Sequence, residues 1–251
     1  MSVLLLGETG FLGKEVSDLF FKKKTYSRKI DLSKIRLISN ILKKKKPDLI
    51  INCAVVANFK SNYSKKMLAV NFLAVKKLVD YCVNNKKTLI QVSGTIVHPM
   101  LTTYNKNSKI KPKSFYGKTK FFADKFILKN KKKLDYKIIR FGGIYGKKGP
   151  DHLYINQLIS GKKNIFNGNI NSIKNYIHVK DAAKCIKKLS KIKKKGIYYA
   201  GGEILSFKKM IAIIQRKFGK EIIIKSNKDE KTSEIVITNK IFKIKHFGFY
   251  L

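Results

Sequence analysis

Cysteine is scarce in this sequence, and its scarcity argues against two classes of protein. The three cysteines, Cys53, Cys82 and Cys185, are scattered along the chain and lie beside apolar residues. A disulfide-rich secreted domain needs several paired cysteines, and a structural zinc site needs clustered ligands. We therefore expect buried, reduced thiols and no metal centre.

Long apolar runs are missing as well. No stretch approaches the roughly 20 apolar residues of a membrane-spanning helix, and Met1 leads directly into the short run SVLLLG. That start has neither the charged region nor the cleavage-site pattern of a signal peptide. The sequence predicts a cytoplasmic protein with no membrane partner.

Acidic residues are few, 15 against 56 lysines and arginines, which gives a formal net charge of +41. Such a charge suggests a partner that is a nucleic acid or another polyanion. Arginine, however, is the residue preferred for bidentate phosphate and base contacts. The chain has only four arginines, whereas its 52 lysines are spread over its whole length. We favour a solvated basic surface with no specific nucleic-acid partner; a polyanion-binding protein stays an alternative.

What is present is an alternation of apolar strand patterns with helical patterns. Strand patterns occur at 2–7, 47–56, 88–97 and 135–146, and helical patterns at 12–21, 34–46, 65–85 and 114–130. In the third helical pattern, one face collects the apolar side chains of Met67, Val70, Ala74, Leu78 and Cys82. Strands that are apolar on both faces and alternate with helices predict an α/β fold with a doubly wound parallel sheet.

A glycine-rich turn joins the first strand to the first helix, in the sequence GETGFLG (7–13). Gly7 permits a tight turn, Gly10 lets the backbone approach a pyrophosphate, and Gly13 allows close packing of helix and strand. The free N–H groups of the helix start would face the phosphates. A P-loop is the rival interpretation, and it fails because Glu8 and Glu15 occupy positions that require glycine and Ser or Thr.

Two Tyr-x-x-x-Lys spacings occur, at Tyr116–Lys120 and at Tyr176–Lys180. In so lysine-rich a chain the spacing alone carries no information, so its context decides. The first pair lies in a helical pattern, where residues four apart share a face. The second lies in NYIHVK, which alternates like extended chain, and we interpret it as structural.

Further short segments follow in a recognisable order. They are INCAV (51–55), AVN (69–71), VSGT (92–95), YGKTK (116–120) and IRFGGIYG (139–146). With the glycine turn, they resemble the extended short-chain dehydrogenase/reductase family, the NAD-dependent epimerase/dehydratase group, and in particular its dTDP-4-dehydrorhamnose reductase branch. The resemblance implies a Rossmann-type domain over 1–144 and a small substrate-binding lobe over 145–251, with about 176–202 returning to the Rossmann sheet.

The resemblance also implies a reaction and its residues. A nucleotide-sugar substrate would undergo epimerisation, reduction or dehydration with NAD or NADP. Tyr116 would exchange a proton with the sugar, while Lys120 lowers the pKa of the phenol and holds the nicotinamide ribose. The position of the family's catalytic hydroxyl is taken by Gly94, so Ser93 and Thr95 are the candidates, and Thr95 is our choice. A catalytically weak or inactive relative stays an alternative, and a homodimer is compatible with the family.

The same resemblance assigns the cofactor contacts. They fall on Gly7, Thr9, Gly10, Phe11, Leu12, Gly13, Arg28, Asp31, Leu32, Ala54, Asn71 and Lys120. Asp31 and Leu32 would contact the adenine. The second strand, expected within 25–32, shows no acidic residue placed for the NAD ribose, and Ser27, Arg28 and Lys29 favour the 2′-phosphate of NADP.

The sequence does not decide the roles of the histidines and of Arg140. The four histidines are dispersed and have no metal-ligand spacing. Arg140, in IIRFGG, suits either a bound phosphate or a structural ion pair.

Overall fold

The computed structural model describes residues 1–21, 30–57, 63–100, 102–225 and 231–251. The chain forms two compact units and passes between them more than once. The first unit comprises Met1–Pro99, Lys109–Arg140 and Ala183–Tyr198, and the second comprises Met100–Ser108, Phe141–Ala182 and Tyr199–Leu251. Within the described ranges, no helix combines the length and the apolar character needed to cross a bilayer.

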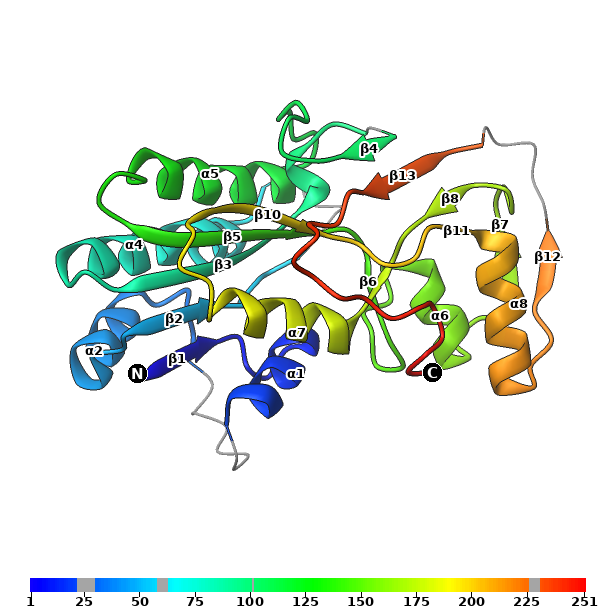
Figure 1. The fold of residues 1–251 in the computed structure, drawn as a ribbon, viewed down its shortest axis with the longest axis horizontal. Helices are drawn as coiled ribbons and strands as arrows, with labels where there is room; N and C mark the ends of the chain where they lie inside the picture. Colours follow the sequence, from blue (N-terminus) through cyan, green and yellow to red (C-terminus); the bar gives the residue numbers. More distant parts are fainter. Residues whose placement is uncertain (22–29, 58–62, 101, 226–230) are drawn as a thin grey trace. The chain divides into compact units, whose positions relative to one another are not determined.

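A five-stranded sheet forms the centre of the first unit, in the order β1-β2-β3-β5-β10 (Figure 1). Its strands are β1 (Val3–Leu6), β2 (Leu49–Asn52), β3 (Thr88–Gly94), β5 (Asp135–Phe141) and β10 (Gly196–Ala200). β2 pairs in parallel with both β1 and β3. All four residues of β2 are buried, as expected for a parallel strand covered on both faces. The predicted α/β class with a parallel central sheet is confirmed.

Helices cover both faces of this sheet. They are α1 (Phe11–Phe20), α2 (Ile35–Lys45), α4 (Ala74–Asn84), α5 (Phe115–Lys129) and the part of α7 (Val179–Leu189) that belongs to this unit. Helices α2, α4 and α5 share one hydrophobic cluster with strand residues such as Leu4 and Ile50. Leu5 and Ile51 point to the opposite face and are buried as well. In Figure 1, α1 lies on the other side of the sheet from α4 and α5.

The long helix predicted over 65–85 contains a π-helical turn. It consists of α3 (Lys65–Leu68), the π segment η1 (Ala69–Leu73) and α4. The side chains that the helical period placed on one face are all buried, namely Met67, Val70, Ala74, Leu78 and Cys82. π turns are frequent at functional sites, and this one carries Asn71.

The strands end earlier than their apolar runs predict. β2 ends at Asn52, and β3 ends at Gly94, where the 3-10 turn η2 (Thr95–Val97) begins. β5 ends at Phe141. Apolar residues beyond these ends are part of loops and turns, which a run of hydrophobic letters does not distinguish from strand. The expected second strand is not seen at residues 30–32, and the rest of that stretch lies outside the described residues.

The described residues of the second unit form small sheets, two helices of its own and the first residues of α7. Its strands form the sheets β11-β8-β13-β4, β12-β7 and β6-β9. Their bounds are β4 (Thr103–Tyr104), β6 (Ile144–Tyr145), β7 (Ile165–Asn167), β8 (Ile173–Lys174), β9 (Ile177–His178), β11 (Leu205–Ser206), β12 (Ile223–Lys225) and β13 (Ser233–Val236), and the helices are α6 (Tyr154–Ser160) and α8 (Phe207–Phe218). Tyr176 precedes β9 in extended chain, and a Cβ on Gly143 would lie 2.3 Å from its ring. Lys180, by contrast, lies in α7 and not in the extended chain expected for NYIHVK. The second Tyr-Lys spacing therefore contributes a packed ring and a helical lysine.

The cysteines are embedded in apolar surroundings. Cys82 and Cys185 are buried and Cys53 is partly buried. Burial raises the pKa of Cys53 and of Cys82 to about 12, so both thiols stay protonated at neutral pH. In the part of the chain that the structure describes, no three side chains of the metal-binding types are grouped around a common point.

Candidate active site

Glycines shape the turn between β1 and α1. Gly7 has a φ of +78°, and a Cβ there would come within 2.5 Å of the Ala54 nitrogen. A Cβ on Gly13 would lie 1.9 Å from the Gly7 carbonyl oxygen. Gly10 donates its N–H to the same oxygen at 3.0 Å. The helix start thus touches the turn backbone to backbone, which excludes larger residues at Gly7 and Gly13.

The start of α1 is arranged to receive an anion. Gly10 is the N-cap and supplies no side chain to the first N–H groups, and the first turn has no acidic residue. Thr9 and Gly10 are exposed and Phe11 is partly exposed, whereas the Leu12 side chain is buried. Unpaired N–H groups and the positive end of the helix dipole favour phosphate. The turn therefore fits the pyrophosphate of a dinucleotide.

The turn after β2 lies in the INCAV segment (51–55), and a buried amide pair holds it; the pairing with Gln91 was not predicted. The Asn52 side chain accepts a hydrogen bond from the Ala54 N–H at 3.2 Å and donates one to Gln91 Oε1 at 2.9 Å. Both amides are 1% exposed. The sequence did contain a signal for this pair: Asn52 and Gln91 are polar residues within the apolar runs LIIN and LIQV. A polar side chain that is buried needs a hydrogen-bond partner. The pair fixes Ala54 against the glycine turn.

Asn71 connects the π turn to two neighbours. Its Oδ1 accepts from the Val56 N–H at 2.9 Å, and its Nδ2 donates to the Val56 carbonyl at 2.9 Å and to Thr119 Oγ1 at 3.1 Å. Asn71 is 2% exposed. Its amide is satisfied within the protein, so the structure gives it a positioning role for the turn after β2 and for α5.

The first turn of α5 packs closely against η2. Ser114 caps the helix by accepting a hydrogen bond from the Gly117 N–H at 3.0 Å. A Cβ on Gly117 would lie 2.6 Å from the Ile96 carbonyl oxygen. This close approach, which sequence reasoning also missed, brings the helix turn that carries Tyr116 against the turn that carries Thr95.

Tyr116 and Lys120 lie one helical turn apart on α5, as predicted. Lys120 is 3% exposed, and its Nζ donates a hydrogen bond to the Val92 carbonyl oxygen at 2.6 Å. Burial lowers the pKa of Lys120 to about 8, and Asp124 and Cys53 act in the opposite direction. The amine is thus held at the carboxyl end of β3.

The expected lowering of the Tyr116 pKa is wrong for this structure. Burial raises the pKa of Tyr116 to about 12, because removing a phenolate from water is costly. A phenol with this pKa is protonated at neutral pH. Its raised pKa also makes this phenol a weaker acid than free tyrosine.

The two hydroxyl groups beside Gly94 have different surroundings. Ser93 is 6% exposed, and its Oγ donates to Asp124 Oδ2 at 3.1 Å. Thr95 opens η2 and is partly exposed. Ser93 thus uses its single donor inside the protein, whereas Thr95 is the more exposed of the two hydroxyl residues.

The residues assigned to the adenosine end are only partly described. Asp31 is exposed, and its Oδ1 accepts from the Ser33 N–H at 3.0 Å and from the Ser33 hydroxyl at 2.6 Å. These hydrogen bonds hold the pKa of Asp31 below its usual value. Leu32 is 5% exposed and belongs to the hydrophobic cluster. Arg28, with Ser27 and Lys29, lies outside the described residues.

Arg140 forms a structural ion pair, one of the two roles left open by the sequence. Its Nη2 lies 2.8 Å from Asp124 Oδ2, and both side chains are at most 4% exposed. His98 is buried beside it, with Nδ1 2.7 Å from the Lys109 carbonyl oxygen. Asp124 was missed, since nothing in its local sequence distinguishes it from a surface acid.

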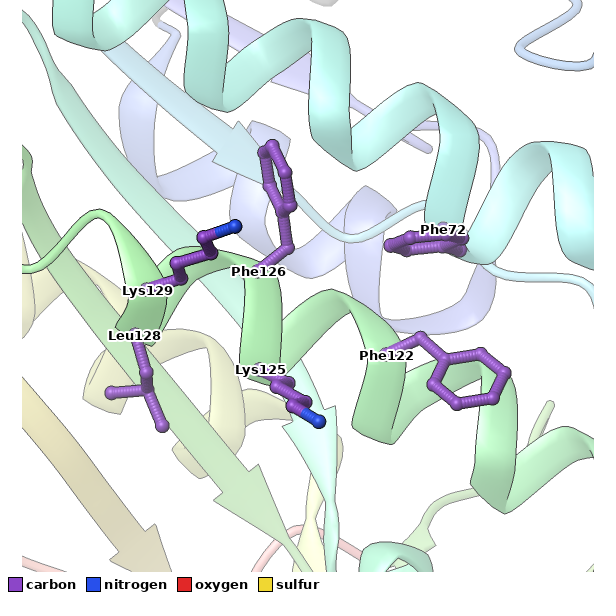
Figure 2. Close-up of a pocket in the computed structure, with 6 residues that line it drawn as sticks. All are labelled: Phe72, Phe122, Lys125, Phe126, Leu128 and Lys129. Carbon is purple, nitrogen blue, oxygen red and sulfur yellow. The ribbon is translucent and has the colours of Figure 1, made fainter.

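A separate apolar groove of about 500 Å³ lies on another face of α5. Figure 2 shows Phe72 of η1 facing the α5 side chains that line it. The lining residues are Phe72, Phe122, Lys125, Phe126, Leu128 and Lys129. None of them belongs to the Tyr116–Lys120 face, so this groove is distinct from the candidate active site.

The chain is similar to a known protein family and to several solved structures. The family model described as "RmlD substrate binding domain" matches residues 1–230, which is most of the 251-residue chain. No curated protein matches the chain.

Several solved structures share the fold. A dTDP-4-dehydrorhamnose reductase from Clostridium acetobutylicum is 20% identical, with 96% of this chain and 91% of that chain covered and a TM-score of 0.78. The Bacillus anthracis dTDP-4-dehydrorhamnose reductase in complex with NADP is 18% identical, with coverages of 98% and 95% and a TM-score of 0.78. MoeE5 in complex with UDP-glucose and NAD is 18% identical, with coverages of 98% and 94% and a TM-score of 0.80. With the family match, these structures confirm the resemblance to the extended short-chain dehydrogenase/reductase family.

Proposed function

The chain belongs to the RmlD substrate binding domain family, and from this membership and the α5 site we propose that it is an NAD(P)-dependent reductase of a nucleotide-activated sugar. One observation carries the proposal. Tyr116 and Lys120 lie on one face of α5, whose first turn packs against the η2 turn that carries Thr95. A phenol and a hydroxyl would thus lie near one carbonyl group, with the amine of Lys120 one helical turn further along α5.

The glycine turn supports the cofactor assignment. The Gly7–Gly13 contact leaves no room for a Cβ, and α1 begins without a side-chain cap, as a pyrophosphate site requires. Relatives have been seen with NADP and with NAD. Ser27, Arg28 and Lys29 favour NADP. Bound NAD(P)H would supply the hydride for the reduction.

The chain's own residues would supply the proton and hold the reactants. Tyr116, with its pKa raised to about 12, would donate a proton to the carbonyl oxygen as it becomes an alcohol. The Thr95 hydroxyl would donate a hydrogen bond to the same oxygen and stabilise the charge that develops there. Lys120, in its protonated form, would hold the ribose hydroxyls of the cofactor.

The substrate class rests on the relatives and on charge. The reductase relatives are named for a dTDP-sugar, and MoeE5 was solved with UDP-glucose. A sugar nucleotide carries a negatively charged diphosphate. The net charge of +41 would raise the local concentration of such an anion at low salt.

The direct test is an assay with NADPH or NADH and dTDP-4-dehydrorhamnose, following the absorbance of the reduced nicotinamide. Stoichiometric formation of an alcohol supports a reductase. Turnover of UDP-glucose or dTDP-glucose without net cofactor consumption would instead indicate epimerisation or dehydration.

A second candidate is a cofactor-binding relative without catalysis. Gly94 at the family's hydroxyl position and the bond between Ser93 and Asp124 favour it, because both remove a donor from the site. Saturable NADPH binding without turnover on a panel of nucleotide sugars would establish it.

A further inference from the structure

Helix α5 carries a third ionisable residue on the face of the catalytic pair. Asp124 lies one turn beyond Lys120 and two turns beyond Tyr116, and residues at this spacing are neighbours on a helix. Asp124 is 1% exposed. The proposed function gives no task to this buried carboxylate.

The two carboxylate oxygens of Asp124 differ in their hydrogen bonds. Its Oδ2 accepts from Arg140 Nη2 at 2.8 Å, from Arg140 Nε at 3.1 Å and from Ser93 Oγ at 3.1 Å. Its Oδ1 is buried and has no hydrogen-bond partner within the described residues. A carboxylate oxygen left unsatisfied in the interior is costly. An ion pair with arginine alone does not explain this arrangement, since a forked pair would use both oxygens.

The charge around Lys120 indicates a second task. The ionisable groups that act on Lys120 are Asp124 and Cys53, and Tyr116 lies one turn before it. Burial raises the pKa of Cys53 and of Tyr116 to about 12, so both are neutral near pH 7. In the described part of the chain, Asp124 is buried on the same face of α5, one turn beyond Lys120, and it is the carboxylate whose charge acts to raise the pKa of that amine.

His98 is a further titratable group, and it lies beside the ion pair of Asp124 and Arg140. His98 Nε2 lies 3.5 Å from Arg140 Nη1, and burial lowers the pKa of His98. His98 is thus neutral near pH 7. Among the described residues grouped around Lys120, the charged side chains at neutral pH are thus the cations Lys120 and Arg140 and the carboxylate of Asp124.

We propose that Asp124 is a positioning residue of this site: its carboxylate keeps the buried amine of Lys120 protonated at neutral pH and holds the Ser93 hydroxyl away from the substrate. The role of Lys120 in holding the cofactor rests on the proposed function, whereas its protonation state does not. Replacing the carboxylate with an amide removes the negative charge and leaves both cations. Lys120 would then lose its proton at a lower pH, and cofactor binding would weaken at that pH.

The test measures the protonation of Lys120 directly. Protein carrying lysine labelled with ¹³C at Cε is titrated by NMR from about pH 6 to about pH 10, and the Lys120 signal is identified by its loss in Lys120→Arg. Surface lysines titrate near pH 10.4, so a midpoint near 8 stands apart from them. In Asp124→Asn the midpoint should fall by about one unit or more, an effect of at least about tenfold on the proton affinity.

Matched variants separate charge from structure. Asp124→Glu should restore most of the wild-type midpoint, and Ser93→Ala, which loosens the same cluster but keeps every charge, should leave it unchanged. Arg140→Gln should move it upward, because Asp124 then has one cation fewer. This opposite shift keeps the test decisive if Asp124→Asn does not fold. An unchanged midpoint in Asp124→Asn, or no upward shift in Arg140→Gln, would overturn the inference.

A second readout links the inference to the reaction. NADPH fluorescence titrations over the same pH range should show binding that weakens near the Lys120 midpoint and at a lower pH in Asp124→Asn. If the NMR midpoint shifts but the wild type never binds NADPH, the protonation role of Asp124 stands and the proposed function fails. If NADPH binds, and Asp124→Asn shifts neither the NMR midpoint of Lys120 nor the pH midpoint of NADPH binding, the proposed function stands and the inference fails.

Discussion

Lys120 and Val92 join helix α5 to the carboxyl end of strand β3, through a hydrogen bond of 2.6 Å from Nζ to the carbonyl oxygen. The bond fixes the amine where a parallel sheet places its ligands. It also keeps a buried cation in contact with a backbone dipole, and this compensates part of the cost of burial. Burial also lowers the pKa of Lys120 to about 8, closer to neutrality than that of an exposed lysine.

The stability of the protein should depend on pH through Lys120. Burial lowers its pKa from 10.5 to about 8, so between these values the unfolded chain binds more protons than the folded one, and stability rises with pH. Relative to Lys120→Met, the free energy of unfolding of the wild type should increase as the pH rises from 8 towards 10.5 and stay level below 8. Urea denaturation of both proteins, kept below pH 10 so that tyrosines do not contribute, measures this difference. A difference that does not change with pH contradicts the account.

The two hydroxyls beside Gly94 should respond differently to substitution. Thr95→Ala should lower kcat by about 10²–10³-fold, the usual effect of removing one donor to a developing oxyanion. Ser93→Ala should change kcat little and lower the free energy of unfolding by about 1–3 kcal/mol, because Asp124 loses a donor. Steady-state kinetics and chemical denaturation of the two variants, with Thr95→Ser as the conservative control, test the assignment. The opposite pattern would make Ser93 the catalytic hydroxyl.

The glycine turn should tolerate alanine at one position better than at another. A Cβ on Gly13 would lie 1.9 Å from the Gly7 carbonyl, whereas one on Gly10 would lie at 3.2 Å. Gly13→Ala should therefore lower the melting temperature strongly and abolish saturable NADPH binding. Gly10→Ala should weaken NADPH binding with a smaller loss of stability. Equal melting temperatures for the two variants would show that the turn is not as tight as described.

Much of this fold follows from local sequence. The alternation of apolar runs and helical periods predicts the parallel sheet and the buried face of the helix over 65–85, because these patterns report which faces are covered. The glycine spacing in GETGFLG predicts a turn, which the structure shows to be close-packed. The position of Tyr116 and Lys120 on one face of α5 follows from helical geometry alone.

The remainder depends on contacts between distant segments. Ser93, Asp124 and Arg140 meet only when β3, α5 and β5 pack together, so no local pattern indicates the cluster. The pKa of Tyr116 differs from expectation for the same reason, since burial is a tertiary property. The strand ends at Asn52 and Gly94 were misplaced because apolar letters continue into the loops.

The most direct test of the account is the effect of Tyr116→Phe on the NADPH-dependent reduction of dTDP-4-dehydrorhamnose, with NADPH affinity measured in the same samples. The phenylalanine keeps the ring and removes the proton donor. The account predicts that kcat falls by about 10²–10⁴-fold while the dissociation constant of NADPH stays within about a factor of two of the wild-type value. Turnover that persists at the wild-type rate would contradict the proposal that this phenol supplies the proton.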